Sequence, residues 1–390
     1  MQPEFSPGRT VQIKTPETIL FGIGACRELT ERIEQFPDGC VLIVTDAGLV
    51  KAGVATRIRD LLTPANRSVE IFDGVQPDPD KECVDNCLAA LKSSQANMLL
   101  GIGGGSCMDV AKVTAALAVN GGQISDYVGI SKLPRRGLPT ILMPTTAGTG
   151  SEVTPIAVIS DVKQHLKLGL VSPHLYCNLA IVDPELTVSC PSKTTASAGL
   201  DTLTHAVEVL TNKFASSLID TLMFEAIRLI GLHLRTCISN GADLQARAGM
   251  SLAALYGGLG LGSVNTAAVH ALAYPLGGTF DIPHGLANSI LLPYVMDFNR
   301  PACLEKFARI TQVLEPDFTG SPDEKATRAV RIVVDLAKDV GIPQRLREIG
   351  IPRDAIEQMA VSAAKVTRLL NNNPREMTVE DIKALYERAY

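Results

Sequence analysis

The sequence lacks the excess of positive charge that nucleic-acid-binding proteins carry. Its 390 residues include 36 Lys and Arg against 41 Asp and Glu, which gives a formal net charge of -5. The one compact basic cluster, Arg135–Arg136, lies between Pro134 and Gly137, as is typical of a solvated turn. The sequence therefore offers no basic surface for a phosphate backbone, and we predict no nucleic-acid partner.

Long apolar runs and a targeting segment are also missing. No stretch reaches the roughly 20 consecutive apolar residues that a membrane-spanning helix needs. The opening MQPEFSPGRT is polar and contains proline, unlike the basic start and apolar run of a signal peptide. We therefore expect a soluble, cytoplasmic protein with no membrane partner.

A disulfide framework is a further absence. The nine cysteines are an odd number, scattered through a long chain and mostly within apolar segments, which favours reduced core thiols. Cys83 and Cys87 are spaced to share a helix face, but two thiolates without companions nearby are typical of a core rather than of a metal site.

The apolar pattern of the first half predicts a parallel sheet with covering helices. A content of 46% hydrophobic and 20% charged residues over this length suffices for two packed cores. Short apolar runs alternate with amphipathic stretches, and this alternation is typical of βαβ units. The expected strands are 41–44, 69–72, 97–102 and 140–143, and the expected helices are 52–62 and 82–91.

The pattern changes after Asp183–Pro184. From Thr194 onward apolar residues recur at helical spacing, as over 218–238 and 244–259, and β-branched runs disappear. We find no internal repeat, low-complexity tract or proline-rich linker. The sequence therefore predicts an α/β domain over residues 1–190 and an all-α domain over residues 191–390.

Three consecutive glycines, Gly103–Gly105, join the strand at 97–102 to the helix that follows it. Glycines let a phosphate approach the backbone, and the free amides at a helix start bind it. We expect Ser106 to cap this helix, with Asp109 as its capping-box partner. The alternative is an ordinary strand-to-helix turn. The order also departs from the common Rossmann fingerprint, in which the acidic residue follows the glycines.

Two more features of the first half are typical of a dinucleotide site. Asp46, after the strand at 41–44, suits the ribose hydroxyls and repels the additional phosphate of NADP, which favours NAD. Its alternative role is a helix cap or turn. The loop Pro144–Glu152 places hydroxyls and glycines behind another strand, at the edge where open α/β sheets bind ligands, with a plain polar loop as the alternative.

One carboxylate and three imidazoles form a candidate metal site in the second half. Asp201 and His205 are four residues apart in a helical segment, so both leave the same face and can bind one cation. His270 and His284 follow in glycine-punctuated, otherwise apolar segments. Three nitrogens and one oxygen without thiolate suit Fe²⁺ or Zn²⁺, with one position left open for catalysis. The alternative is that each histidine is a satisfied core residue.

These residues carry a resemblance to the iron-containing, or group III, alcohol dehydrogenase family that spans nearly the whole chain. The matching segments are Phe21–Ala25, Gly103–Ser106 with Asp109 and Lys112, Pro144–Thr149, Asp201 with His205, His270–Gly278, Ile282–Asn288, Asn373–Arg375 and Thr378–Asp381.

The resemblance implies a dehydroquinate synthase-like architecture: an N-terminal dinucleotide domain, a C-terminal helical metal domain and an active site in the cleft between them. It implies that Asp201, His205, His270 and His284 bind the metal, and that the molecule is a homodimer or a larger homo-oligomer. The implied NAD contacts are Asp46, Gly103, Gly104, Gly105, Ser106, Asp109, Thr145, Thr146, Thr149 and Lys167.

Tyr274 is a departure from the family pattern, because many relatives carry a histidine there. It follows His270 by four residues, so helical geometry directs its hydroxyl towards the same site. A phenol could relay a proton through water, although its ordinary pKa near 10 makes it a poorer shuttle at neutral pH than imidazole. The other reading is a wall of the substrate pocket. We count His270 and Tyr274 as the candidate catalytic residues.

The predicted function is a metal-dependent, NAD-linked alcohol dehydrogenase that interconverts a small aliphatic alcohol or diol and its aldehyde. The metal, Fe²⁺ with Zn²⁺ as the alternative, acts as a Lewis acid on the substrate oxygen during hydride transfer. Alternatives on the same fold are a glycerol dehydrogenase- or maleylacetate reductase-like oxidoreductase, a lyase such as dehydroquinate synthase, and a catalytically silent nucleotide-binding or structural homologue.

Overall fold

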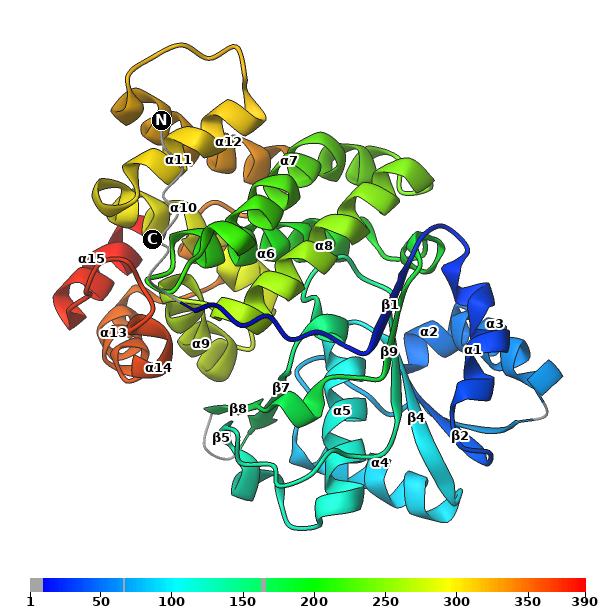
Figure 1. Cartoon of the computed structure of the whole chain (residues 1–390). Helices are drawn as coiled ribbons and strands as arrows, with labels where there is room; N and C mark the ends of the chain where they lie inside the picture. Colours follow the sequence, from blue (N-terminus) through cyan, green and yellow to red (C-terminus); the bar gives the residue numbers. More distant parts are fainter. Residues whose placement is uncertain (1–9, 66, 163–165) are drawn as a thin grey trace. The chain divides into compact units, whose positions relative to one another are not determined.

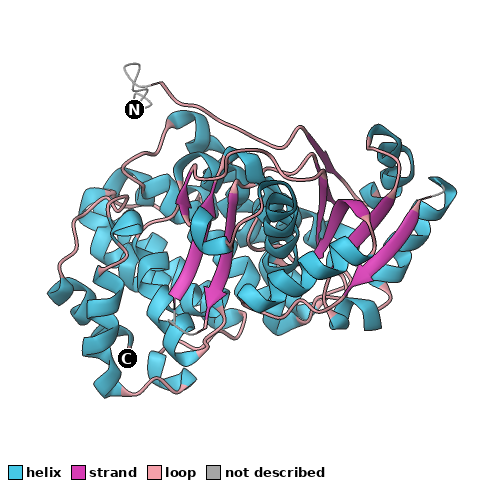
Figure 2. Ribbon diagram, turned by 90° about the horizontal axis from the view of Figure 1, so that it is seen from below, coloured by secondary structure: helices cyan, strands magenta, loops and turns pink. Residues whose placement is uncertain are grey.

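The computed structural model describes residues 10–390 apart from residues 66 and 163–165. The chain divides into two compact units, one formed by Lys14–Cys190 and the other by Pro191–Tyr390 with the described residues before Lys14. All strands in the described residues belong to the first unit, and the second is helical (Figures 1 and 2). The predicted fold class, an α/β unit followed by an all-α unit, is confirmed.

The α/β unit is built on a six-stranded parallel sheet with the order β1-β9-β6-β4-β2-β3, accompanied by a three-stranded sheet with the order β5-β8-β7. The predicted strands are confirmed as β2, β3, β4 and β6. The nine strands are β1 (Thr18–Phe21), β2 (Cys40–Val44), β3 (Ser68–Phe72), β4 (Ala96–Gly103), β5 (Gly129–Ile130), β6 (Thr140–Pro144), β7 (Ile156–Asp161), β8 (Leu166–Val171) and β9 (Leu179–Val182).

The helix predicted over 82–91 is present, but the one predicted over 52–62 begins later. Gly53 adopts the left-handed conformation, with φ of 78°, and separates two helices there. The helices of this unit are α1 (Leu29–Arg32), α2 (Ala47–Lys51), α3 (Val54–Leu62), α4 (Lys81–Ser93) and α5 (Gly105–Asn120).

Alternate residues of the central strands form the core of the α/β unit. Side chains on successive strand positions point to opposite faces, so one parity of β2, β4 and β6 packs together against α1 and α3. Representative core members are Ile43, Leu100, Met143, Leu29 and Ile58, all fully buried. This packing fixes the strands, and thereby the loops that follow them.

In the helical unit the predicted helices over 218–238 and 244–259 are confirmed as α7 and α8. α6 packs against α7, α8 and α10, while α9 contacts α10, α13 and α14. The ten helices are α6 (Ser192–Thr211), α7 (Ser217–Ser239), α8 (Leu244–Val264), α9 (Ala268–Phe280), α10 (His284–Asn299), α11 (Leu304–Leu314), α12 (Pro322–Asp339), α13 (Ile356–Ala364), α14 (Thr367–Leu370) and α15 (Val379–Ala389).

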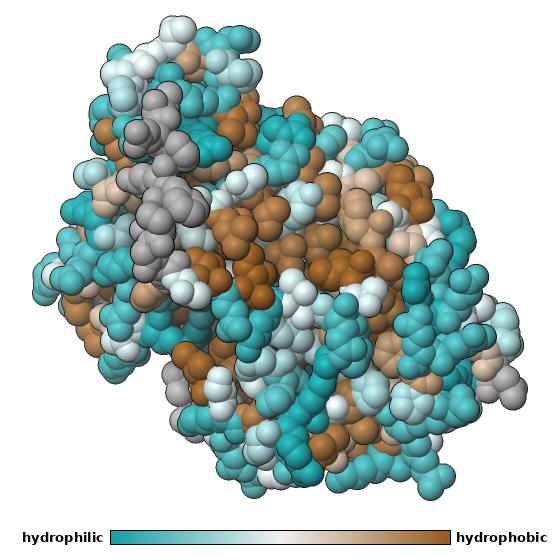
Figure 3. Space-filling model, in the orientation of Figure 1, coloured by the Kyte–Doolittle hydropathy of each residue, from teal (hydrophilic) through white to brown (hydrophobic). Residues whose placement is uncertain are grey.

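Helices α6 and α8 are apolar around much of their circumference. Most of their residues are buried in the helical unit, and apolar side chains also gather over this part of its surface in Figure 3. No single helix of the described chain is both long and apolar enough to cross a membrane, whereas α8 and α9, bent by 102°, pass such a test only as a pair and only by length and composition.

All nine cysteines lie among the described residues, and all are free thiols. Seven of them are buried. The predicted use of cysteine as a core residue is confirmed.

Candidate active site

Helix α6 presents two candidate metal ligands and a further carboxylate on one face. Asp201, His205 and Glu208 are spaced at i, i+4 and i+7, the repeat that keeps side chains on one side of a helix. All three are buried, with exposures of 2 to 3%. A buried charged group needs a partner, so this face must meet complementary groups on other helices.

The other two candidate ligands come from the starts of α9 and α10. After α8, Asn265 adopts a positive φ of 76° and the chain turns into α9, which places His270 in its first turn. His284 is the first residue of α10 and follows Pro283. His270 is buried, whereas the His284 side chain is 39% exposed. The accessible side of the cluster is therefore the side of His284.

The four predicted ligands converge. The Nε2 atoms of the three histidines lie near the Asp201 carboxylate: that of His205 is 3.7 Å from Oδ2, that of His270 is 4.0 Å from Oδ1, and that of His284 is 3.8 Å from Oδ1. One ligand atom from each residue lies within 4.8 Å of all the others. Donors about 2 Å from a shared ion lie about 3 to 4 Å from one another, so the spacing suits one cation.

Asn288, which the sequence interpretation missed, sits among these donors. It is fully buried and one turn after His284 in α10. Its Nδ2 donates to Oδ1 of Asp201 at 2.7 Å and lies 3.1 Å from Nε2 of both His270 and His284. An amide NH₂ has two hydrogens and only donates, so it can bond two of these three acceptors at once, and the Asp201 oxygen is the nearest of them.

Glu208, also missed, holds His270 from its far side. The Nδ1 of His270 donates to Oε2 of Glu208 at 2.5 Å, and the backbone NH of Val269 donates to Oε1 at 2.6 Å. This contact keeps the proton on Nδ1 and leaves the Nε2 lone pair free for a metal. The carboxylate also lies at the positive end of the α9 dipole, which stabilises its charge.

The cluster shifts the pKa values of its members. Burial favours neutral Asp201, but the three imidazoles and Asn288 outweigh it and lower its pKa. Burial lowers the pKa of His205 to about 4, although Asp201 opposes this effect. Burial also disfavours charged His270, yet Glu208 raises its pKa above the ordinary value. Without a metal, therefore, the site holds an anionic Asp201 beside a neutral His205.

The residues fit a divalent Fe²⁺ or Zn²⁺ ion. Three imidazole nitrogens and one carboxylate oxygen converge without a thiolate, and one ligand is tied to a carboxylate that sets its tautomer. A second group of potential ligands, Cys26, Asp183 and Glu185, does not fit. Asp183 accepts hydrogen bonds from backbone amides, and Arg27 and Arg57 already pair with Glu185.

Tyr274 lies one turn after His270 in α9, as predicted from the spacing. Burial raises the pKa of its hydroxyl, and the positive charge of Arg368 acts in the opposite direction. An elevated pKa makes the phenol a weak acid at neutral pH, which favours a pocket-wall or hydrogen-bonding role over proton transfer. Arg368 was not identified from the sequence.

The predicted dinucleotide residues follow three neighbouring parallel strands in the α/β unit. Asp46 comes just after β2, Gly103 ends β4, and Thr145 follows β6. The sheet order β6-β4-β2-β3 places these carboxyl ends side by side. From β2 the chain continues to β3 on one side and then to β4 on the other, so β2 and β4 flank a topological switch point, the usual ligand position in open α/β sheets.

The glycines permit close packing of the two loops. A Cβ on Gly105 would lie 2.8 Å from Cγ2 of Thr149, and one on Gly104 would lie 3.6 Å from Oγ1 of Thr146. Gly103 has a φ of 151°, and its carbonyl accepts from the Thr145 backbone NH at 2.9 Å. The loops thus meet most tightly at Gly105, where a side chain would interfere with Thr149, and in ordinary contact at Gly104.

The predicted capping box at the start of α5 is wrong. The N-cap is Gly104, without a side-chain cap, and Ser106 lies within the helix. Asp109 instead accepts from the Ser151 hydroxyl at 2.6 Å and from the Val158 NH at 2.8 Å. These two distant partners, Ser151 and Val158, replace the local cap, so Asp109 anchors the second loop and not the helix end.

Asp46 and Lys167 both have protein partners. Oδ1 of Asp46 accepts from the Leu49 NH at 3.0 Å and caps α2, which is the alternative role that the sequence left open. Lys167, in β8, lies 2.7 Å from Oδ1 of Asp78 and 2.9 Å from Oγ of Ser160. A dinucleotide contact by Lys167 has to compete with this ion pair.

Glu152 closes the second loop as a buried carboxyl with an unpartnered oxygen. It is 2% exposed, and no described residue hydrogen-bonds its Oε2. Burial raises its pKa from 4.5 to about 7, partly opposed by its own backbone amide and by Lys112. When the pKa of a group is higher in the folded protein than in the unfolded chain, its contribution to stability is fully present below the unfolded-state pKa. That contribution is lost as the pH rises through the folded-state pKa.

We therefore expect Glu152→Gln to flatten the pH dependence of stability. Between about pH 5 and pH 9 the wild type should lose on the order of 3 kcal/mol more than the variant, since ionised Glu152 is poorly solvated. Thermal unfolding of both proteins across this range measures the difference. Parallel pH profiles would contradict a buried, neutral Glu152.

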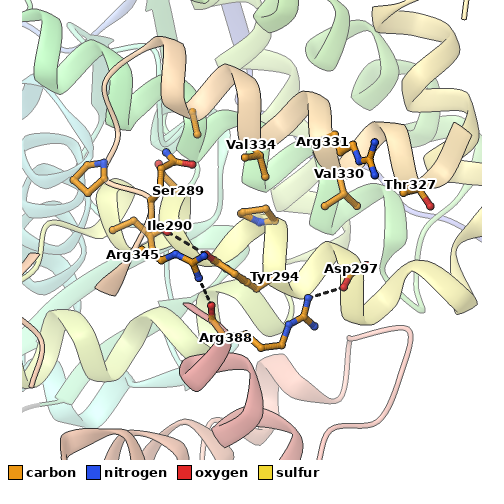
Figure 4. A pocket seen from close by; sticks show the side chains of 14 residues that line it. Ser289, Ile290, Tyr294, Asp297, Thr327, Val330, Arg331, Val334, Arg345 and Arg388 are labelled. Carbon is orange, nitrogen blue, oxygen red and sulfur yellow. Dashed lines mark hydrogen bonds and ion pairs between the residues drawn. The ribbon is translucent and has the colours of Figure 1, made fainter. Parts of the chain in front are cut away.

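A separate cavity of about 360 Å³ lies in the helical unit (Figure 4). It is lined by α10, α12 and the end of α15, with Tyr294, Arg331 and Arg345 among its residues. Arg388 at its edge pairs with Asp297 at 2.7 Å. None of the candidate metal ligands lines this cavity, so the site is defined by the converging donors and not by this cavity.

The described fold and site define a class: a parallel sheet with glycine loops at its switch point, together with a helical unit that holds a cluster of three imidazoles and one carboxylate. The chain belongs to the iron-containing alcohol dehydrogenase family. The family model for iron-containing alcohol dehydrogenases matches residues 16–184. The model for the C-terminal part of the Fe-containing alcohol dehydrogenase family matches residues 195–390. The prediction that the protein is an enzyme of the iron-containing alcohol dehydrogenase type is confirmed.

Individual relatives cover nearly the whole chain. Long-chain-alcohol dehydrogenase 1 of Geobacillus thermodenitrificans is 40% identical over 373 residues, 95% of this chain and 94% of the relative. NAD-dependent methanol dehydrogenase of Bacillus methanolicus is 34% identical, covering 96% and 98%. The crystal structure of a 1,3-propanediol oxidoreductase superposes with a TM-score of 0.95 at 36% identity, covering 98% and 100%. The names of these relatives span very different alcohols.

Proposed function

We propose that this protein is an NAD-linked, metal-dependent dehydrogenase that interconverts a small aliphatic alcohol or diol and the corresponding aldehyde. The observation that carries the proposal is the convergence of Asp201, His205, His270 and His284 on one centre in the helical unit. The overall reaction is alcohol plus NAD⁺ giving aldehyde, NADH and a proton. Family membership disfavours the lyase and the silent homologue among the alternatives.

The protein residues supply position and charge. A divalent cation held by the four ligands supplies Lewis-acid polarisation of the substrate oxygen. Asp201 contributes the negative charge, Asn288 holds Asp201, and Glu208 holds His270 in the tautomer that can bind metal. The partly exposed His284 marks the side from which substrate reaches the cluster. Tyr274 lies one turn from His270 and forms a wall of the substrate site.

We assign NAD to the carboxyl edge of the six-stranded sheet. Loop packing around Gly103–Gly105 and the switch point between β2 and β4 support this position. Asp46 has one oxygen engaged by Leu49, and its carboxylate disfavours the additional phosphate of NADP. The other proposed contacts are Ser106, Asp109, Thr145, Thr146, Thr149 and Lys167.

We further propose Fe²⁺ as the native metal, a homodimeric or larger assembly, and a cytoplasmic location. The name of the family supports iron, and a set of donors without thiolate accommodates it. Nine free thiols are in keeping with a reducing compartment.

Metal replacement tests the function directly. Protein purified without oxygen and stripped with a chelator is expected to lose NADH oxidation with short aldehydes, and Fe²⁺ should restore more of it than Zn²⁺. Metal content and initial rates are measured on the same samples. Restoration by Zn²⁺ alone would overturn the choice of iron, and undiminished activity in metal-free protein would overturn the proposed chemistry.

A further inference from the structure

The cavity of about 360 Å³ in the helical unit has the size and the walls of a small-molecule site. Helix α10 contributes Ile290, Pro293 and Tyr294 to its lining, and α12 contributes Val330 and Val334. Two of its sides are therefore largely apolar. Pockets that bind small molecules have volumes from about 300 to about 1,000 Å³ and combine apolar walls with a few polar groups that orient the ligand.

The charged groups of this cavity are mainly arginines. Arg331 comes from α12, Arg388 from α15, and Arg345 from the segment between α12 and α13. Figure 4 shows Arg345 and Arg388 close to Tyr294, with Arg331 on the α12 side. Three elements that are far apart in the sequence thus bring positive charge to one cavity.

These positive charges are not balanced within the cavity. Among the described residues that line it, Asp297 is the one carboxylate. Asp297 is shared, because it lies 2.7 Å from Nη2 of Arg388 and 3.4 Å from Nε of Arg300. Arg345 donates to the backbone carbonyl of Arg388 at 2.5 Å, and its Cζ lies 6.0 Å from the centre of the Tyr294 ring. Neither of these contacts neutralises its charge.

Arg345 is the arginine best placed to bind an anion. It is half-buried, whereas Arg331 and Arg388 are exposed. Salt screens a half-buried charge less than an exposed one. A guanidinium has five N–H donors and binds carboxylate and phosphate groups through paired hydrogen bonds, so the contact with one carbonyl leaves donors available. The two exposed arginines add to the positive potential that attracts an anion.

We propose that this cavity is a binding site for a small organic anion, in which a carboxylate or a phosphate is joined to a short apolar chain. Arg345 binds the anionic group, and the apolar chain lies against Ile290, Val330 and Val334. None of the four candidate metal ligands lines the cavity. The site is therefore separate from the metal site and goes beyond the proposed function.

Titration calorimetry tests the proposal on the metal-loaded protein, because α10 carries His284 and Asn288 as well as one wall of the cavity. The probes are hexanoate, butyl phosphate and hexanamide, the neutral counterpart of hexanoate. We expect at least one of the two anions to bind at least about tenfold more tightly than hexanamide, the size expected of a charged hydrogen-bonded contact. Comparison of the two anions identifies the preferred charged group.

Variants locate the bound anion. Arg345→Gln should weaken binding of the preferred anion at least about tenfold, and Arg345→Lys should retain part of the affinity because it keeps the charge. Arg331→Gln changes an exposed side chain and should cause a smaller loss without disturbing the packing. The matched control is Arg328→Gln, also on α12: Arg328 pairs with Glu315 and does not line the cavity, so its replacement should leave the affinity unchanged.

Three results would overturn the inference. The first is that neither anion binds more tightly than hexanamide. The second is that Arg345→Gln and Arg331→Gln both bind the anion as the wild type does, which would place it elsewhere, such as at the metal. The third is an equal loss in Arg328→Gln and Arg345→Gln, which would indicate a general effect of net charge. Because calorimetry measures no turnover, these outcomes are independent of whether the proposed function holds.

Discussion

Replacement of His270 by alanine is expected to lower kcat/KM at least about a thousandfold, because Lewis-acid stabilisation of this kind contributes several kcal/mol to the transition state. His270 is buried, and its ring stacks at 5.0 Å between centroids on His205 and lies 5.1 Å from His284. Removing it takes away one of four donors and leaves the Glu208 carboxylate without its imidazole partner. The metal should therefore bind weakly or be lost.

The measurements are metal content, steady-state rates and NADH binding by fluorescence. Binding of NADH should persist, since we assign it to the α/β unit and not to the helices. His233→Ala is the matched control: His233 belongs to the same unit, in α7, but lies outside the cluster. A folded His270→Ala protein that keeps both metal and rate would refute the ligand assignment.

Three central strands of the fold were predictable because they are buried on both faces and read as continuous apolar runs, whereas β9, a four-residue strand that is equally buried, was missed. β2, β4 and β6 are of this kind. β3 is an edge strand that alternates exposed and half-buried residues, and its short β-branched and aromatic run identified it. β7 alternates buried and half-buried residues in a small separate sheet, and β1 has only four residues. Such strands depend on their neighbours for identification, so periodicity alone does not find them.

The metal ligands were predictable in unequal ways. Asp201 and His205 share a helix face by spacing alone. His270 and His284 are far along the chain and were linked to them by their glycine-punctuated, apolar segments and then by the family resemblance. The structure brings all four together. Glu208 had a signal, as an acidic residue at i+7 from Asp201 within an apolar helix.

The start of α5 shows why local rules fail near a binding loop. Ser106 and Asp109 satisfy the capping-box pattern, yet Asp109 binds Ser151 and the backbone of Val158 instead. Lys112 then donates to the carbonyls of the same region, at 2.9 Å to that of Ser151. Long-range partners that cannot be read from spacing thus fix the second loop beside the glycines.

Replacement of Glu208 by glutamine is expected to weaken metal binding by about 10- to 100-fold, the range typical of residues that orient a metal ligand. The carboxylate accepts from both His270 Nδ1 and the Val269 NH. A glutamine can satisfy Val269 with its oxygen, but its NH₂ group then faces Nδ1 as a donor. The imidazole would then adopt the tautomer with its proton on Nε2, and a protonated Nε2 has no lone pair for the metal.

Competition with a coloured chelator measures this affinity, and thermal unfolding tests the structural role of the same carboxylate. Glu208→Asp should recover part of the affinity because it keeps an acceptor, whereas Glu225→Gln, which disrupts an exposed ion pair with Arg228, should leave metal binding unchanged. Metal affinity in Glu208→Gln equal to that of the wild type would mean that the tautomer of His270 is set by something other than Glu208. Because the predicted defect lies in the lone pair and not in the number of ligands, saturating metal should restore much of the rate in Glu208→Gln but not in His270→Ala.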